Sequence, residues 1–205
     1  MSFVTVEKPR PYITLITLNR PERMNALNGR MFEGIVMSLI LANADPSVGV
    51  IVISHAGPHF GVGGGRSGDS FSPAMSQVDP TIKRCRKPVI AAVRGYSIGA
   101  SNHMAYTCDF TIAGESAIFG QNGPRIGSPA TGYTMASSTH VVGTKRAREM
   151  WLRCRLLTAQ EALEAGGFDD RYERSYSEDP EVVSELAAAF IEAQQRVGVA
   201  GEGRD

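Results

Sequence analysis

A serine between two glycines is the first candidate for chemistry. Residues 95–99 read Gly-Tyr-Ser-Ile-Gly and match the G-x-S-x-G turn that exposes a nucleophilic serine in α/β-hydrolases. A nucleophile at Ser97 needs an acid and then a histidine farther along the chain, and Asp109 and His140 are the available pair. A serine hydrolase is therefore one open function, and the alternative is that Ser97 is only a small residue in a turn.

A second glycine-rich motif, Gly-Gly-Gly-Arg-Ser-Gly at residues 63–68, fits the G-x-G-x-x-G dinucleotide fingerprint. That motif must follow a strand directly and open a helix, so that the helix N-terminus meets the pyrophosphate. Here loop residues come before the motif, and Asp-Ser-Phe-Ser-Pro follows at residues 69–73 where a helix should begin. This context argues against dinucleotide binding.

The two glycine-rich turns can also act together. The turns at residues 62–65 and 99–101 each follow an expected strand of one sheet. Glycine lets backbone come close to a ligand, so two N–H groups can point at one oxygen. Such a pair of donors is an oxyanion hole, which stabilises negative charge on a carbonyl oxygen.

The elements that must position these turns alternate between strands and helices. Short β-branched and apolar runs predict strands, and apolar residues at helical spacing predict helices. Residues 57–80 are rich in glycine and proline and predict one long loop. The alternation predicts a single α/β domain with mostly parallel strands. The predicted strands are 12–18, 48–53, 89–93 and 110–113, residues 95–99 are a turn, and the predicted helices are 29–44, 101–107, 132–142, 144–155, 158–165 and 181–197.

Composition excludes several classes of function. The 205 residues carry 21 Lys and Arg and 21 Asp and Glu, so no net charge would attract nucleic acid or an anionic membrane. Three widely spaced cysteines give no disulfide framework and suit a reducing compartment. The sequence shows neither a signal peptide nor an apolar membrane span, and His55 and His59 lack further ligands for a metal site. We expect a cytoplasmic protein that binds a small molecule.

Several motifs in chain order resemble the crotonase superfamily of enoyl-CoA hydratases and isomerases. Residues 19–27 (Asn-Arg-Pro-Glu-Arg-Met-Asn-Ala-Leu) and 60–65 (Phe-Gly-Val-Gly-Gly-Gly) are two of them. Residues 87–99 are similar to a third, and Cys-Asp-Phe at 108–110 and Phe-Gly-Gln at 119–121 continue the match. The resemblance runs from about residue 5 to residue 168. It implies a crotonase-like spiral of ββα units.

Within the superfamily, residues 119–128 and 145–151 look most like ketocyclohexanecarboxyl-CoA hydrolase and dihydroxynaphthoyl-CoA synthase. Those enzymes open or close a carbocycle by (retro-)Claisen chemistry on a CoA thioester. The resemblance therefore implies C–C bond cleavage or ring closure on a β-keto acyl-CoA. An enoyl-CoA hydratase/isomerase-like activity and a non-catalytic paralogue are the alternatives within the family.

The resemblance also implies where the substrate binds. The oxyanion-hole donors fall at the amides of Gly64 and Ala100. Coenzyme A is part of the substrate, with no tightly bound cofactor, and a homo-oligomer, a trimer or a dimer of trimers, is expected. The core is expected at residues 1–168, followed by a short C-terminal helix and polar tail at 169–205, shorter than in most family members. The CoA-binding strip falls at Arg23, Met24, Val62, Gly65 and Arg66.

Several residues depart from the family pattern. Two acids of the enoyl-CoA hydratases are replaced by His103 and Gly123, which disfavours simple hydration, and Ala130 replaces the acid of the ring-cleaving group. Gly65 replaces an Asp of the first turn, and Ala100-Ser101 replaces two glycines of the second.

With these acids absent, Ser128, Tyr133 and His103 are the remaining polar candidates near the expected pocket. Tyr133 can donate a proton to an enolate, or pack as an aromatic residue at a helix start. His103 can act as a base or pack inside the protein. Ser128 can bind through its hydroxyl or cap the next helix.

Overall fold

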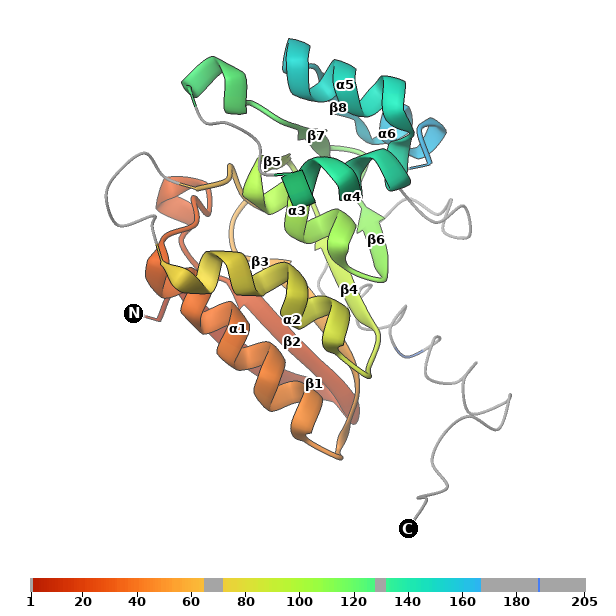
Figure 1. The fold of residues 1–205 in the computed structure, drawn as a ribbon. Coiled ribbons are helices and arrows are strands. Elements are labelled where there is room, and N and C mark those ends of the chain that lie inside the picture. The colour runs from red at the N-terminus through yellow and green to blue at the C-terminus, as the bar shows by residue number, and fades with distance from the viewer. Residues whose placement is uncertain (1, 65–71, 128–131, 167–187, 189–205) are drawn as a thin grey trace.

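A computed structural model describes residues 2–64, 72–127, 132–166 and 188 (Figure 1). Two sheets organise this part of the chain: one five-stranded sheet in the order β1-β2-β3-β4-β6 and one three-stranded sheet in the order β5-β7-β8. Helices cover both sheets. In the described residues, no helix is long and apolar enough to cross a membrane.

The larger sheet is mostly parallel. Strand β2 (Tyr12–Leu18) pairs in parallel with β3 (Val48–His55), and the parallel order continues through β4 (Val89–Val93) to β6 (Phe110–Ala113). Strand β1 (Val4–Arg10) adds an antiparallel edge. Every residue of β4 is buried, as expected for a parallel strand that is covered on both faces.

Helix α1 (Gly29–Ala44) covers one face of this sheet next to α2 (Val78–Arg84), as Figure 1 shows. The side chain of Asn28 caps α1 by accepting a hydrogen bond from the Met31 amide at 2.9 Å. The helix turns an apolar face toward the strands, because Met31, Ile35 and Leu39 recur at helical spacing and are fully buried. These residues build the main core.

The smaller sheet supports the second half of the fold. Strand β5 (Tyr96–Ile98) pairs in parallel with β7 (Ile118–Gly120), and β7 pairs antiparallel with β8 (Leu156–Thr158). Figure 1 shows the remaining helices gathered around this sheet. They are α3 (Ala100–Thr107), α4 (Gly132–Val142), α5 (Thr144–Arg153) and α6 (Ala159–Glu164); the short 3-10 turns are η1 (Pro21–Arg23), η3 (Pro73–Gln77) and η4 (Gly123–Ile126).

The structure confirms a single α/β domain with mostly parallel strands, and it corrects two local predictions. The expected turn at residues 95–99 contains strand β5, so the two glycine-rich turns follow strands of different sheets, β3 and β5, and not of one sheet as expected. The expected loop at residues 57–80 becomes helical at Pro73, where η3 begins and leads into α2. The expected helix at residues 181–197 lies outside the described residues, apart from Ala188.

Candidate functional site

The two glycine turns lie side by side. The first follows β3 and the second follows β5, and Gly61 forms a parallel bridge with Ser97. The Gly61 amide donates to the Tyr96 carbonyl at 2.8 Å, and the Ile98 amide donates to the Gly61 carbonyl at 2.9 Å. The first turn therefore runs along β5 like an additional strand and reaches the start of α3.

Gly63 brings the two turns into contact. Its φ of +82° is strained for any residue with a side chain. A Cβ atom at this position would lie 3.0 Å from the Ile98 carbonyl oxygen and 3.3 Å from the Ala100 nitrogen. By contrast, a Cβ on Gly64 would meet nothing within 4 Å. The backbone at Gly64 therefore borders open space next to Ala100.

The amides of Gly64 and Ala100 have no hydrogen-bond partner among the residues that the structure describes. Ala100 is the first residue of α3, and amides in the first turn of a helix have no partner inside it. The first helical hydrogen bond of α3 runs from the His103 amide to the Gly99 carbonyl at 3.0 Å. Within the described ranges, neither the Gly64 nor the Ala100 amide donates a hydrogen bond. Two unpaired donors on touching turns are suited to stabilise one negatively charged oxygen.

Ser101 ties the two turns together. Its side chain is fully buried, and its Oγ accepts a hydrogen bond from the Gly63 amide at 3.2 Å. A Cβ on Gly61 would lie 2.3 Å from the same Oγ, so Gly61 leaves room for this hydroxyl. The role of Ser101 was not predicted from the sequence, because it depends on two segments that are distant along the chain.

Three uncharged polar residues flank the second turn. His103 lies one helical turn after Ala100, and Gln121 follows Gly120, whose carbonyl accepts from the Gly99 amide at 2.9 Å. The Oδ1 atom of Asn122 lies 3.6 Å from where a Cβ on Gly99 would be. Sequence reasoning had singled out His103 but neither of the other two.

His103 is uncharged at neutral pH. Burial lowers its pKa from 6.5 to about 4, and an interaction with the Gln121 carboxamide opposes this shift. The imidazole also packs against Tyr106 and Trp151, with ring centroids 5.5 Å and 5.4 Å away. A neutral imidazole can accept or donate a hydrogen bond, but it does not act as a general acid at neutral pH.

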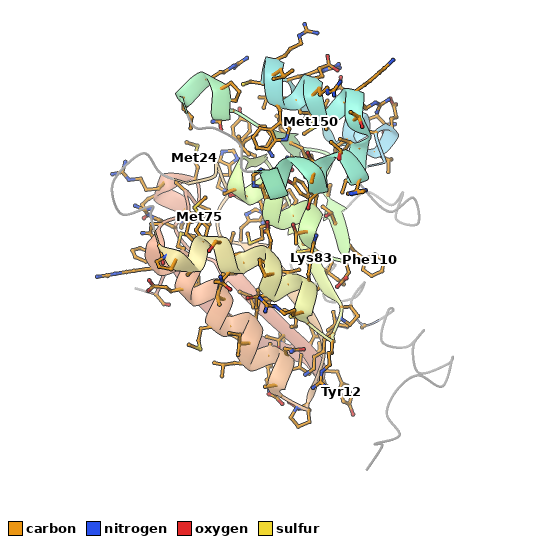
Figure 2. The ribbon with its side chains drawn as sticks, viewed as in Figure 1. Tyr12, Met24, Met75, Lys83, Phe110 and Met150 are labelled. Atoms are coloured by element: carbon orange, nitrogen blue, oxygen red, sulfur yellow. The ribbon has the colours of Figure 1, made fainter. Side chains whose placement is uncertain are left out.

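Part of the expected CoA-binding strip lies next to the first turn. The Leu27 amide donates to the Gly63 carbonyl at 2.8 Å, which fixes the preceding segment beside the turn. Arg23 and Met24 of that segment are exposed, and Figure 2 labels the Met24 side chain. Val62 is half-buried in the turn itself. Gly65 and Arg66 lie outside the described residues.

Asn25 holds this segment in place. Its fully buried side chain accepts from the Arg20 amide at 2.7 Å and donates to the carbonyls of Ala56 and His59 at 2.9 Å and 2.7 Å. Both Met24 and Asn25 have positive φ values, of 49° and 51°. The asparagine of the first quoted motif is thus a structural clamp at the end of β3.

Of the other expected site residues, Ser128 and Ala130 lie outside the described residues, and for Tyr133 the structure describes only the backbone of α4. Gly123 begins η4, close to the Gln121 position. The structure places Gly63, which precedes Gly64, against Ala100, and His103 one helical turn after Ala100.

The serine hydrolase alternative is not supported by the geometry. Ser97 is fully buried inside β5 and its Oγ lacks a partner among the described residues, whereas a nucleophile elbow exposes its serine. Asp109 accepts a hydrogen bond from the Val89 amide at 2.8 Å, and His140 is exposed on α4. No catalytic triad forms from these described residues.

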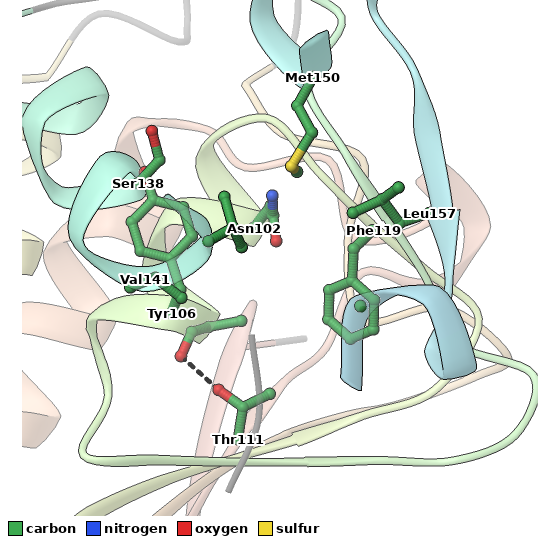
Figure 3. Close-up of a pocket in the computed structure, with 11 residues that line it drawn as sticks. Asn102, Tyr106, Thr111, Phe119, Ser138, Val141, Met150 and Leu157 are labelled. Carbon is green, nitrogen blue, oxygen red and sulfur yellow. Dashed lines mark hydrogen bonds between the residues drawn. The ribbon is translucent and has the colours of Figure 1, made fainter. Parts of the chain in front are cut away.

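A small apolar cavity of about 30 Å³ lies along α3, as Figure 3 shows. Its polar lining groups already have partners within the protein. Thr111 donates to the Ala105 carbonyl at 2.8 Å, and the Ser138 hydroxyl accepts from the Trp151 indole at 3.2 Å. We therefore regard this space as a packing defect of the core and not as part of the site.

Comparison with known proteins identifies relatives of the same architecture. Residues 10–171 match the family model described as enoyl-CoA hydratase/isomerase. A solved monofunctional enoyl CoA isomerase from M. smegmatis shares 30% identity with a TM-score of 0.77, covering 99% of this chain and 87% of that one. A probable enoyl-CoA hydratase/isomerase from Mycobacterium abscessus shares 32% identity with a TM-score of 0.78, covering 94% and 75%. An enoyl-CoA hydratase from Thermoplasma volcanium shares 28% identity with a TM-score of 0.82, covering 94% and 78%.

Proposed function

Because the chain belongs to the enoyl-CoA hydratase/isomerase family, we propose that it binds an acyl-CoA thioester and stabilises negative charge on the thioester oxygen. The observation that carries this proposal is the close approach of the two turns at Gly63, together with amides of Gly64 and Ala100 that have no hydrogen-bond partner among the described residues. Backbone donors fixed in this way need no reorganisation when charge develops on the oxygen. Backbone N–H donors also remain in place when side chains of the site are substituted.

The reaction we propose is cleavage or closure of a C–C bond in a β-keto acyl-CoA. In the cleavage direction, water adds to the β-keto carbon and the bond between the α and β carbons breaks. Its electron pair becomes the enolate of the thioester, whose oxygen is held by the amides of Gly64 and Ala100. As this bond breaks, the hydrated β carbon loses one hydroxyl proton to solvent, and the α carbon then takes up a proton. The products are a carboxylic acid and a shorter acyl-CoA or, from a cyclic substrate, a single ring-opened acyl-CoA that carries the carboxylic acid.

The residues around the turns support this reaction over hydration of an enoyl-CoA. Hydration needs a general acid and a general base. The two positions where the resemblance places carboxylates hold His103, which is neutral, and Gly123. An enolate held by backbone amides needs no carboxylate for its stabilisation, and Tyr133 is the proton donor that we propose for the α carbon. With no carboxylate at either position, binding without turnover is the second candidate.

The CoA moiety is proposed to lie along Arg23, Met24 and Val62 and to continue over Gly65 and Arg66. Arg23 is exposed and positively charged, which suits the phosphates of CoA. The hydrogen bond from Leu27 to Gly63 links this strip to the first turn, so the thioester end of CoA would arrive beside Gly64.

Isothermal calorimetry tests the proposed function. Acetyl-CoA, acetoacetyl-CoA and a cyclic β-keto acyl-CoA would be titrated into the protein, with free coenzyme A as the reference. We expect saturable binding of the thioesters, with product analysis of the β-keto ligands reporting turnover. Absence of binding by all three thioesters would overturn the proposal, and binding without product would assign the chain to the non-catalytic candidate.

A further inference from the structure

Two nitrogen atoms beside the second turn are buried without hydrogen-bond partners among the described residues. They are Nε2 of His103 and Nε2 of Gln121, whose side chain is only 2% exposed. Buried polar groups are nearly always paired, because an unpaired one loses its bonds to water and gains nothing in return. Each of these two nitrogen atoms could therefore gain a hydrogen bond from a ligand.

The two side chains belong to the same small region as the oxyanion donors. Cα–Cβ bonds of a helix tilt toward its N-terminus, so the side chain of His103 leans back toward Ala100. Gln121 directly follows Gly120, which is hydrogen-bonded to Gly99. The Gln121 carboxamide interacts with the imidazole of His103, and the Nε2 atom of each side chain remains unpaired.

This region offers hydrogen bonds without charge. Gln121 and Asn122 are amides, Gly123 has no side chain, and the imidazole of His103 is neutral at neutral pH because burial lowers its pKa to about 4. Among these four described residues, an anionic ligand group would find no positive partner and a cation would find no carboxylate. The complementary group is an uncharged oxygen, such as a ketone or a hydroxyl.

The distance along α3 between Ala100 and His103 indicates where on the acyl group that oxygen would lie. His103 comes three residues after Ala100, and three residues of helix rise about 4.5 Å. In an acyl thioester, an oxygen on the β carbon lies at a comparable distance from the thioester oxygen. One oxygen can therefore reach the amides of the turns while the other reaches Gln121 and His103.

Resting on the proposed function, we propose that Gln121 and His103 determine substrate specificity by binding an uncharged oxygen on the β carbon of the acyl group. They select β-keto and β-hydroxy acyl-CoA thioesters over saturated ones of the same length. A purely structural role for Gln121 is the competing explanation, and it makes the opposite prediction for stability.

The test compares three four-carbon ligands by calorimetry: butyryl-CoA, acetoacetyl-CoA and 3-hydroxybutyryl-CoA. They differ only at the β carbon. The variants are Gln121→Met, which keeps the length of the side chain without its donor, and His103→Phe, which keeps a ring against Tyr106 and Trp151. Gln160→Met, at an exposed glutamine on α6, is the matched control. Melting temperatures are recorded for every protein.

We expect the wild type and Gln160→Met to bind the two β-oxygen ligands about tenfold more tightly than butyryl-CoA, because the unpaired nitrogen atoms gain a partner. In Gln121→Met and His103→Phe, the ratio of the affinity for the β-oxygen ligands to the affinity for butyryl-CoA falls to near one. The affinity for butyryl-CoA and the melting temperature stay unchanged. An equal loss for all three ligands, a lower melting temperature without a change in preference, or a wild type without preference would overturn the proposal. If the wild type binds none of the three, the proposed function itself fails, and this outcome is distinct from the others.

Discussion

The hydroxyl of Ser101 accepts a hydrogen bond from the amide of Gly63 at 3.2 Å, and this bond joins the two turns of the candidate site. The two residues are 38 positions apart in the chain. Both are buried, so water cannot replace either partner. The bond holds the first turn beside the start of α3, where we propose that the amides of Gly64 and Ala100 bind the same oxygen.

Ser101→Ala should destabilise the fold, because it leaves the buried Gly63 amide without an acceptor. Such a loss costs about 1–3 kcal/mol in the free energy of unfolding. Ser97→Ala is a matched control, since Ser97 is equally buried but its hydroxyl lacks a partner in the described structure. We expect no loss of stability there, measured by urea denaturation of both variants. Equal effects of the two substitutions would contradict the role of Ser101.

Ala100→Pro should abolish most of the turnover of a β-keto acyl-CoA, because proline lacks the N–H that we propose as a donor. Proline is favourable at the first position of a helix, and the Ala100 amide makes no hydrogen bond to the described residues. Loss of one oxyanion donor typically lowers the rate by about 10²–10³. Thr144→Pro changes the first residue of α5, which also follows a glycine, and should keep full activity. A fully active Ala100→Pro protein would rule out this donor.

Stability should fall between pH 6.5 and about 4 because His55 is buried in its neutral form. Burial, and then the charge of Arg94, lower the pKa of His55 from 6.5 to about 4, and its Nε2 accepts from the Arg94 amide at 3.3 Å. In this window the unfolded chain binds a proton that the folded chain excludes, so stability is complete above the unfolded pKa and decreases as the pH falls. The contribution is about 1.4 kcal/mol per pH unit.

His55→Gln keeps an acceptor of similar length for the Arg94 amide and removes the titration. The free energy of unfolding of the variant should therefore depend less steeply on pH than that of the wild type in this window. Urea denaturation at several pH values gives both slopes, and identical slopes would show that His55 does not titrate on unfolding.

Tyr133→Phe should lower kcat for a β-keto acyl-CoA by about tenfold or more if the hydroxyl donates the proton to the α carbon. The substitution retains the ring and removes only the hydroxyl. Steady-state kinetics with the wild type as reference measures the effect. An unchanged kcat would assign Tyr133 to packing at the start of α4.

The sequence predicted most helices and strands of the fold and missed β1, α2 and the short strands of the smaller sheet. Strand β2 and helix α1 follow from apolar periodicity, which is a local signal. Strand β1 was missed because it contains Pro9 and is exposed, which an edge strand tolerates. Helix α2 was missed because Pro80 suggested a break, although proline is compatible with the first turn of a helix.

Prediction of the site had a similar limit. The resemblance placed the turns and the pair Gly64 and Ala100, because glycine-rich motifs are visible in a short stretch of sequence. The roles of Ser101 and Gln121 could not be inferred, since each depends on a segment more than ten residues away that the fold brings into contact. Strand β5 was missed for the same reason, because its three residues pair with β7 and form the bridge to Gly61.

The central claim, that the two turns hold a thioester oxygen, is tested most directly by a pair of ligands that differ in that oxygen alone. Acetyl-CoA carries the carbonyl, and its thioether analogue S-ethyl-CoA has a methylene group in its place. Both would be titrated calorimetrically into the wild type and into Ala100→Pro. We predict that the wild type binds acetyl-CoA roughly tenfold more tightly than S-ethyl-CoA, since hydrogen bonds to the carbonyl are lost in the analogue, and that Ala100→Pro loses most of this difference. Equal affinity of the wild type for the two ligands would contradict the account.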